Sequence, residues 1–118
     1  MKKSKMNYAI ATTDDFERDF KKLSKKYRSL KADVDALKED LLKNPTMGNP
    51  LGMNSYKVRM AIASKGGGKR GGARVITCLV LVDVENSDIY LLSIYDKGEL
   101  DTVTTKQIKY LKQEAGLQ

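Results

Sequence analysis

The fold is decided by residues 55–95, which read SYKVRMAIASKGGGKRGGARVITCLVLVDVENSDIYLLSIY. At the start of this stretch apolar residues recur at every second position, which is typical of a strand with one buried face. Two further apolar runs follow at 73–84 and 89–95, each after turn-forming residues. The pattern predicts three consecutive antiparallel strands, with Asn86-Ser87 as a two-residue turn before the last one.

The residues before this stretch predict a strand and two helices. In residues 8–12, larger side chains alternate with alanines, which predicts a short first strand. Asp14 with Glu17 is a helix-start signal. Ser29 is a candidate cap of a second helix, and the prolines and glycines of residues 44–52 predict a loop after it. The apolar positions at helical spacing, which we expect to be core, are Phe16, Phe20, Leu23 and Tyr27 in the first helix and Leu30, Val34, Leu37 and Leu41 in the second.

The carboxyl end predicts one more helix, because Thr104 and Gln107 have the spacing of a capping box. The predicted order is therefore β-α-α-β-β-β-α. This order describes a single small α+β domain, residues 1–118, in which the helices, including a helical hairpin, all pack on one face of a mainly antiparallel sheet.

Two assumptions about the turns predict which residues share a face. If Asn86-Ser87 is the complete turn, Tyr95 faces Cys78 and Lys97 faces Ile76. If the glycine-rich hairpin is centred between Gly68 and Lys69, Arg59 faces Cys78 and Ala63 faces Arg74. The residues expected on the outer sheet face are then Lys57, Arg59, Arg74, Tyr95 and Lys97. The residues expected against the helices are Tyr56, Val58, Met60, Ile62, Leu79 and Leu81.

The composition excludes several kinds of chemistry. The chain has 118 residues, no histidine and a single cysteine, Cys78. These counts exclude a Ser-His-Asp triad, a Cys-His pair, an internal disulfide and a multi-cysteine metal site, so we expect no metal and no cofactor. No apolar run approaches the length of a membrane span, and the first 15 residues lack the apolar core of a secretory signal. We therefore expect a cytoplasmic protein without a membrane partner.

The positive charge is confined to one block of the chain. The net charge is +7, and residues 41–82 contain seven cations and no acid, whereas the rest of the chain has 15 cations and 15 acids. A field focused in one region is typical of a site for a polyanion, although lysine-rich surfaces also serve solubility.

The glycine-rich segment formally matches a nucleotide-binding fingerprint in residues 66–71, GGGKRG. That fingerprint needs a strand before it and a helix after it, whereas strands are predicted on both sides here. A basic loop that contacts a phosphate backbone through Lys65, Lys69 and Arg70 is the better interpretation. The alternative is a flexible hairpin loop with incidental cations.

The residue types on the outer sheet face suit RNA cleavage. RNA supplies its own nucleophile, the 2′-hydroxyl, so a protein needs to move protons and stabilise negative charge on the phosphate. A lysine among other cations can act as a base, whereas an arginine keeps its proton and binds phosphate with two hydrogen bonds. Tyr95 is a candidate for stacking on a base or orienting the phosphate. The alternative is a solvated sheet face without a ligand.

On these residues the chain resembles the RelE/HigB toxins of bacterial type II toxin–antitoxin systems. The matching stretches are residues 56–60, 65–76 and 89–97, with supporting similarity at Phe16, Phe20-Lys21-Lys22-Leu23 and 48–52. The resemblance spans about residues 7–112. It implies a ribosome-dependent mRNA endoribonuclease that uses no metal and leaves a 2′,3′-cyclic phosphate. It also implies a cognate antitoxin, and a toxin–antitoxin complex that binds operator DNA.

The resemblance assigns roles to individual residues. Lys57 and Arg59 match the paired strand cations of RelE-like members, and Arg74 matches the arginine that opens the next strand. Lys97 stands where those members have an arginine. Many RelE members have a further tyrosine near the position of Val103, and Tyr95 is the candidate for its role in this chain. The residues expected to contact ribosomal RNA are Lys65, Lys69 and Arg70 in the loop and Lys22, Lys25 and Lys26 in the first helix.

Two other functions stay open. A ParE-like inhibitor of gyrase has the same fold and no nuclease activity, but it does not need cations gathered on one face. An RNA- or ribosome-binding module of the same fold would use those cations for binding alone. The identity of the general base also stays open.

Overall fold

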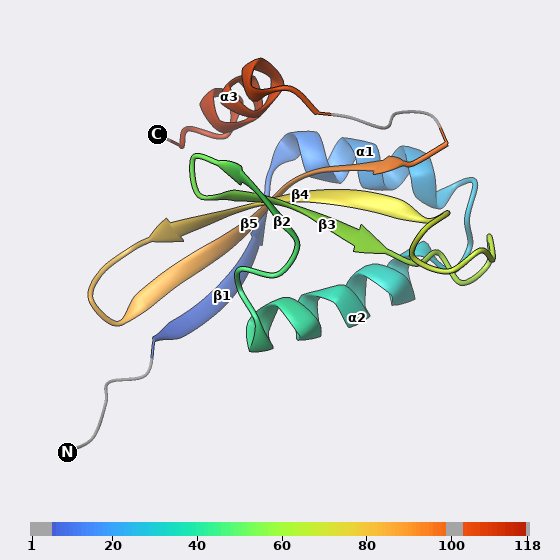
Figure 1. Ribbon diagram of the computed structural model, residues 1–118, viewed down its shortest axis with the longest axis horizontal. Helices are drawn as coiled ribbons and strands as arrows, with labels where there is room; N and C mark the ends of the chain where they lie inside the picture. The colour runs from blue at the N-terminus through green and yellow to red at the C-terminus, as the bar shows by residue number, and fades with distance from the viewer. Residues whose placement is uncertain (1–5, 99–102, 118) are drawn as a thin grey trace.

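A mixed five-stranded sheet runs through the molecule, with the strand order β1-β5-β4-β3-β2 (Figure 1). The computed structural model describes residues 6–98 and 103–117. The strands are β1 Asn7–Thr12, β2 Asn49–Gly52, β3 Ser55–Met60, β4 Ala73–Leu81 and β5 Asn86–Asp96. β1 pairs with β5 in parallel, and the other neighbours are antiparallel. The expected α+β class and mainly antiparallel sheet are confirmed.

Strand β2 was not expected from the sequence. Its Asn49 pairs with Lys57 and its Pro50 with Tyr56, where a loop was predicted. Met53 and Asn54 have φ angles of 55° and 56° and connect β2 to β3 as a two-residue turn. A proline is tolerated here because β2 is the edge strand, where one row of N–H groups needs no partner.

Helices α1 and α2 pack on one face of the sheet. α1 is Asp14–Ser24 and α2 is Leu30–Lys43. The Thr13 hydroxyl caps α1 by accepting from the Phe16 N–H at 3.1 Å, one residue before the expected start signal. Ser29 makes no side-chain cap of α2, and its hydroxyl bonds to Asp33 and Ser64 instead. The core under these helices includes all the predicted apolar positions, with Phe20 and Tyr27 partly buried.

Helix α3, Thr105–Glu114, packs on the opposite face, so the expectation that all helices share one face is wrong. Its predicted capping box is present, with Thr104 and Gln107 bonded reciprocally. Leu111 packs on a second core of Ile76, Cys78 and Leu92, whereas Val75 points to the α1–α2 side. β4 is thus buried on both faces, and Figure 1 shows α2 and α3 on opposite sides of the sheet. None of the helices in the two described segments is long and apolar enough to cross a bilayer.

The strand registers differ from the predicted ones, because the β3–β4 connection is centred between Gly66 and Gly67 and the β4–β5 turn is longer than the two residues assumed. Arg74 pairs with Arg59 and with Tyr95, and Cys78 pairs with Ser55 and Tyr90. Residues 61–72 connect β3 to β4, and the β4–β5 turn closes around residues 82–86, where the Val82 N–H donates to Asn86 O. The β3–β4 register is displaced by four residues, and so is the β4–β5 register at residues 73–76, so the predicted sheet faces survive there. A register shift between Ile76 and Thr77 displaces the rest of the β4–β5 pairing by five residues. Leu81 is an exception to the predicted faces: it is 67% exposed at the hairpin tip instead of lying against the helices.

Candidate nucleic-acid interface

Three of the predicted site residues form a row across the sheet. Arg59 on β3, Arg74 on β4 and Tyr95 on β5 are direct cross-strand neighbours. Directly paired side chains lie on the same face of a sheet. Lys57 is two residues from Arg59 on β3 and shares that face. The structure therefore brings together four of the five candidate catalytic residues at the level of the backbone.

A groove at the edge of the sheet brings together three of the predicted cations. It has a volume of about 430 Å³, and its lining includes Lys57, Arg59 and Lys69 but no acidic residue. Gly48 forms part of its wall, and a larger residue does not fit there because a Cβ would stand 2.5 Å from the Lys57 carbonyl oxygen. Lys57 is half-buried, and Arg59 and Lys69 are exposed. We call this feature the basic groove.

A smaller hollow adjoins the basic groove and shares Arg59 and Lys69 with it. Asp33 and Asp40 of α2 line this second hollow. The cations of the groove thus have carboxylates on their α2 side and none on the side of Lys57. An anionic ligand is favoured on the Lys57 side, where it meets no like charge.

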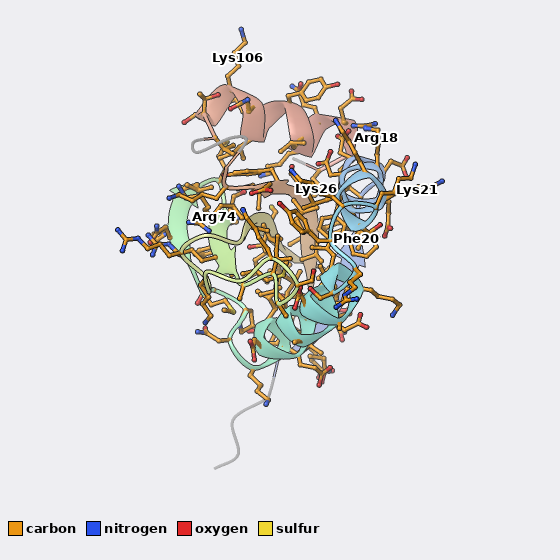
Figure 2. All side chains as sticks on the ribbon, turned by 90° about the vertical axis from the view of Figure 1, so that its right-hand side faces the viewer. Arg18, Phe20, Lys21, Lys26, Arg74 and Lys106 are labelled. Atoms are coloured by element: carbon orange, nitrogen blue, oxygen red, sulfur yellow. The ribbon has the colours of Figure 1, made fainter. Side chains whose placement is uncertain are left out.

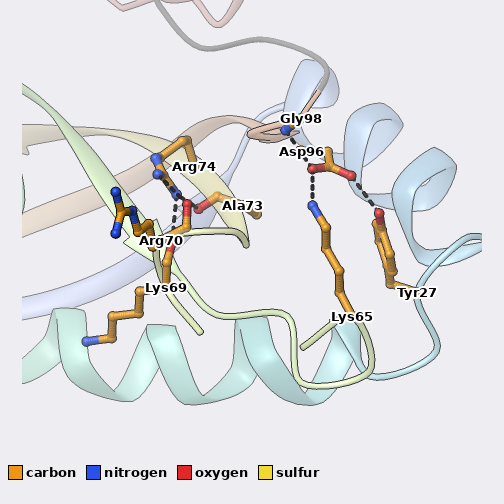
Figure 3. A network of polar contacts seen from close by, with 8 residues as sticks. All are labelled: Tyr27, Lys65, Lys69, Arg70, Ala73, Arg74, Asp96 and Gly98. Carbon is orange, nitrogen blue, oxygen red and sulfur yellow. Dashed lines mark hydrogen bonds and ion pairs between the residues drawn. The ribbon is translucent and has the colours of Figure 1, made fainter. Parts of the chain in front are cut away.

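Arg74 is buried, which contradicts the expectation of an exposed phosphate ligand. Its side chain is 4% exposed, and its guanidinium donates to three carbonyl oxygens of neighbouring backbone (Figure 3). Nη1 bonds to Lys69 O at 2.9 Å and to Ala73 O at 3.1 Å, and Nη2 bonds to Arg70 O at 3.2 Å. The physical reason is the long loop of residues 61–72, which folds back over the start of β4 and covers the side chain.

Lys65 is not a free loop cation, because it pairs with Asp96 at the end of β5. The Lys65 Nζ lies 2.7 Å from Asp96 Oδ1, and the Tyr27 hydroxyl donates to Asp96 Oδ2 at 2.6 Å (Figure 3). Burial alone would raise the pKa of Asp96. Hydrogen bonds from Lys65, Tyr27 and the Gly98 N–H outweigh that effect and hold the pKa at about 2. Asp96 therefore stays ionised and anchors the start of the glycine-rich loop.

A further hollow lies between α1 and the end of β5. It is lined by Lys22 and Lys26 together with Tyr95, Asp96 and Asp19. Burial raises the pKa of Asp19, against the opposing effect of a hydrogen bond from the Ser93 hydroxyl at 2.9 Å. Asp19 and Asp96 thus give this hollow two carboxyl groups beside its two lysines.

The sequence contained a signal for the burial of Asp19, which the distribution of charge along the chain did not reveal. Asp19 is three residues after Phe16 and four before Leu23, so its helical position places it on the inward side of α1. Asp96 follows directly on an apolar strand, which also marked it as a candidate for burial.

The last two predicted residues take different places. Lys25 is exposed at the carboxyl end of α1, beside Lys26. Lys97 is half-buried, and its backbone N–H donates to Gly72 O at 3.1 Å, which ties the end of β5 to the glycine-rich loop. Neither residue lines the basic groove.

Within residues 6–98 and 103–117, no group of three histidine, cysteine or acidic side chains is arranged to hold a metal ion. Cys78 is buried against Ile76 and Leu92 and belongs to the second core. The glycine-rich loop runs from β3 into β4, so it lacks the following helix that a nucleotide-binding fingerprint needs. A scan of the chain against protein-family models found no match.

Proposed function

We propose that this protein is the toxin of a type II toxin–antitoxin system and an endoribonuclease that cuts mRNA on the ribosome. The observation that carries the proposal is the basic groove, where Lys57, Arg59 and Lys69 converge without an acidic residue in the lining. Such a groove fits the backbone of a single RNA strand, which bears one negative charge per phosphate. The resemblance to RelE/HigB toxins supports the same interpretation.

The proposed reaction uses the 2′-hydroxyl of the RNA as the nucleophile. Its oxygen attacks the adjacent phosphorus, the bond to the 5′-oxygen breaks, and a 2′,3′-cyclic phosphate and a 5′-hydroxyl result. One proton leaves the 2′-hydroxyl and one is delivered to the 5′-oxygen. Lys57 and Arg59 would stabilise the charge that develops on the phosphate, and each such donor contributes about 3–4 kcal/mol in the transition state.

The proposed dependence on the ribosome follows from the openness of the site. A lysine acts as a base only after it loses its proton, which exclusion of water favours. Docking into the decoding site would exclude water and align the 2′-hydroxyl with the scissile phosphate, an effect of about 7–11 kcal/mol in model systems. We therefore expect clear cleavage of mRNA on programmed ribosomes and negligible cleavage of free RNA.

The proposed partner is an antitoxin that bears carboxylates. A segment of this kind would cover the basic groove, so binding should weaken as the salt concentration rises. The complex of both proteins would bind operator DNA, as the resemblance implies. An affinity that does not depend on salt would contradict this arrangement and indicate apolar inhibition away from the groove.

An RNA- or ribosome-binding module without catalysis is the second candidate. The burial of Arg74 favours it, since one of the expected phosphate ligands is already bound to backbone carbonyls. Such a module would use the basic groove for affinity and would leave the RNA intact.

The test is to induce the protein in bacterial cells and to map the 5′ ends of mRNA, with Lys57→Ala as the variant. Loss of the Lys57 ammonium should lower the cleavage rate about a hundredfold or more. The matched control is Lys106→Ala, which removes the same charge from a side chain that points away from the molecule (Figure 2).

The outcomes separate the candidates. New 5′ ends within codons of translated mRNA that depend on Lys57 and not on Lys106 support the endoribonuclease. Intact mRNA with arrested ribosomes would leave the binding module, and intact mRNA with broken chromosomes would indicate gyrase inhibition.

A further inference from the structure

We propose that Arg74 is a positioning residue that holds the glycine-rich loop, residues 66–72, as a binding element for a backbone phosphate of RNA. The phosphate would be bound by backbone N–H groups of the loop together with Lys69 and Arg70, and not by the Arg74 guanidinium. The inference rests on the proposed function, because RNA is the ligand, and it assigns the loop and Arg74 their separate roles.

The contacts of Arg74 indicate that its hydrogen-bonding capacity is directed at the loop. Its guanidinium donates to Lys69 O, Arg70 O and Ala73 O at 2.9 to 3.2 Å. No carboxylate in the described part of the chain pairs with it, and only 4% of the residue is exposed. A phosphate could reach this guanidinium only after the loop had moved away.

The same contacts determine which way the loop N–H groups face. In a trans peptide the C=O and the following N–H point in opposite directions. Because Lys69 O is directed inward at Arg74, the N–H of Arg70 is directed outward. Arg74 therefore turns one donor of the loop away from the protein while it binds the carbonyl oxygen of the same peptide.

Four consecutive N–H groups in this loop have no acceptor within residues 6–98 and 103–117. They belong to Gly67, Gly68, Lys69 and Arg70, whereas Gly71 and Gly72 donate to carbonyl oxygens of the loop. Gly66, Gly67 and Gly68 have φ angles of 78°, 80° and 62°. Successive backbone N–H groups in a turn can form a binding site for an anion, and these four groups donate to no acceptor in the described part of the protein.

The loop also continues the basic groove. Lys69 lines the groove with Lys57 and Arg59, so a phosphate on the loop lies next to the cations of β3. The loop is fixed at both ends: Lys65 is bonded to Asp96, and the Lys69 and Arg70 carbonyls are bonded to Arg74 (Figure 3). A loop that is held in its binding conformation loses less entropy when the ligand binds.

The experiment is an NMR titration of the isotope-labelled full chain with a 2′-O-methyl RNA oligonucleotide. This probe carries the phosphates of RNA but lacks the 2′-hydroxyl nucleophile, so binding is measured without cleavage. We expect the backbone N–H resonances of Gly67, Gly68, Lys69 and Arg70 to shift, and the guanidinium resonances of Arg74 to stay in place. Inorganic phosphate should shift the same four amides at higher concentration. A shift of the Arg74 guanidinium without shifts of the loop amides would overturn the inference.

The variant Arg74→Lys provides the second arm. Lysine keeps the positive charge but cannot bond three carbonyl oxygens in one plane, so binding of the 2′-O-methyl RNA should weaken about tenfold. Unchanged affinity would overturn the positioning role. If this variant does not fold, the titration of the wild-type chain decides alone.

The control variant Lys57→Ala separates the inference from the proposed function. It should lose RNA cleavage while the four loop amides still shift with the probe. Amide shifts in a wild-type protein that cleaves no RNA on programmed ribosomes would refute the endoribonuclease and keep the loop site. Cleavage by a protein whose loop amides do not shift would refute the loop site and keep the endoribonuclease.

Discussion

The two ends of strand β4 are built from opposite chemistry. At its start lies the glycine-rich loop with Lys69 and Arg70, and at its end lies the hairpin tip around residues 81–86 with Asp83 and Glu85. Residues 41–82 contain no acid, and residues 75–96 contain no lysine or arginine. The loop end therefore attracts polyanions, and the tip repels them.

The two ends also differ in how they are held. The loop end is anchored by two buried charged side chains, Arg74 and Asp96, which are 4% and 2% exposed. The tip is held mainly by local contacts, in which the Asp83 carboxylate accepts from the Glu85 N–H at 2.8 Å and from the Asn86 side chain. One bond comes from β1, where the Asn7 N–H donates to Glu85 O at 2.7 Å. Val82 and Val84 are exposed at the tip. A long loop needs anchors from elsewhere in the fold, whereas a tight turn is stabilised by its own residues.

The largest effect is expected from Gly72→Ala at the loop end. A Cβ at Gly72 would lie 2.1 Å from Met60 O, which is backbone and cannot move aside without disturbing β3. We expect a loss of about 3 kcal/mol in the free energy of unfolding, measured by urea denaturation. The control is Gly71→Ala, whose Cβ would have no neighbour closer than 3.6 Å and should change stability by less than about 1 kcal/mol. Equal losses in both variants would show that the loop does not approach β3 in this way.

The second effect concerns acid stability. The pKa of Asp96 is about 2 in the folded protein and about 3.9 for an aspartate in an unfolded chain. A lowered folded-state pKa stabilises the protein above the unfolded value and loses this effect as the pH falls through the folded value. Asp96 should thus contribute about 2 kcal/mol at neutral pH, and this contribution should disappear between about pH 5 and pH 2.

Asp96→Asn should remove that part of the pH dependence in urea denaturation. Asp83→Asn at the tip is the matched control. The pKa of Asp83 is also lowered, by hydrogen bonds from the Glu85 N–H and the Asn86 side chain, but the group is exposed and its effect should be small. An acid profile that depends on Asp83 as much as on Asp96 would contradict the contrast between the two ends.

The third effect compares the charges of the two ends. Lys69→Gln combined with Arg70→Gln should weaken RNA binding. It should also lower the slope of log affinity against log salt by about 1.4, since two phosphate contacts to a single strand are lost. Asp83→Asn combined with Glu85→Gln changes the net charge by the same amount in the opposite direction at the tip. This pair should leave the slope unchanged, and a changed slope would show that net charge alone governs binding.

The smallest effect is expected from apolar residues at the tip. Val82 and Val84 are 57% and 87% exposed, so Val82→Thr with Val84→Thr should change the free energy of unfolding by less than about 0.5 kcal/mol. Val75→Thr is the matched control on the same strand, because Val75 is fully buried and a hydroxyl there costs about 1–3 kcal/mol. A large loss in the tip variant would indicate that the tip is covered in solution.

Much of the fold could be read from local sequence patterns. The alternation in residues 55–60 correctly placed Lys57 and Arg59 on the outer face and Val58 and Met60 in the core. Helix starts and the capping box at Thr104 were also predictable, because capping depends on residues only three positions apart. The strand β2 was missed because its proline and glycines are typical of loops and only pairing with β3 makes it a strand.

The candidate site was predicted as a set of residues and not as a set of contacts. The distribution of charge along the sequence identified the cations of the basic groove. The shared face of Arg59, Arg74 and Tyr95 was predicted, but their direct pairing was not, because the predicted registers were wrong. Burial of Arg74 and the pairing of Lys65 with Asp96 were not predictable, since both depend on the path of the long loop.

The sequence by itself determined what repeats over short distances: the inward and outward sides of each strand, the helical faces and the acid-free block. These properties arise from the geometry of one strand or one helix and need no distant partner. The tertiary structure alone decided that β1 lies beside β5, that α3 covers the second face, and that Arg74 is a buried anchor. These arrangements join residues far apart in the chain, and they depend on how the loops close and which surfaces pack together.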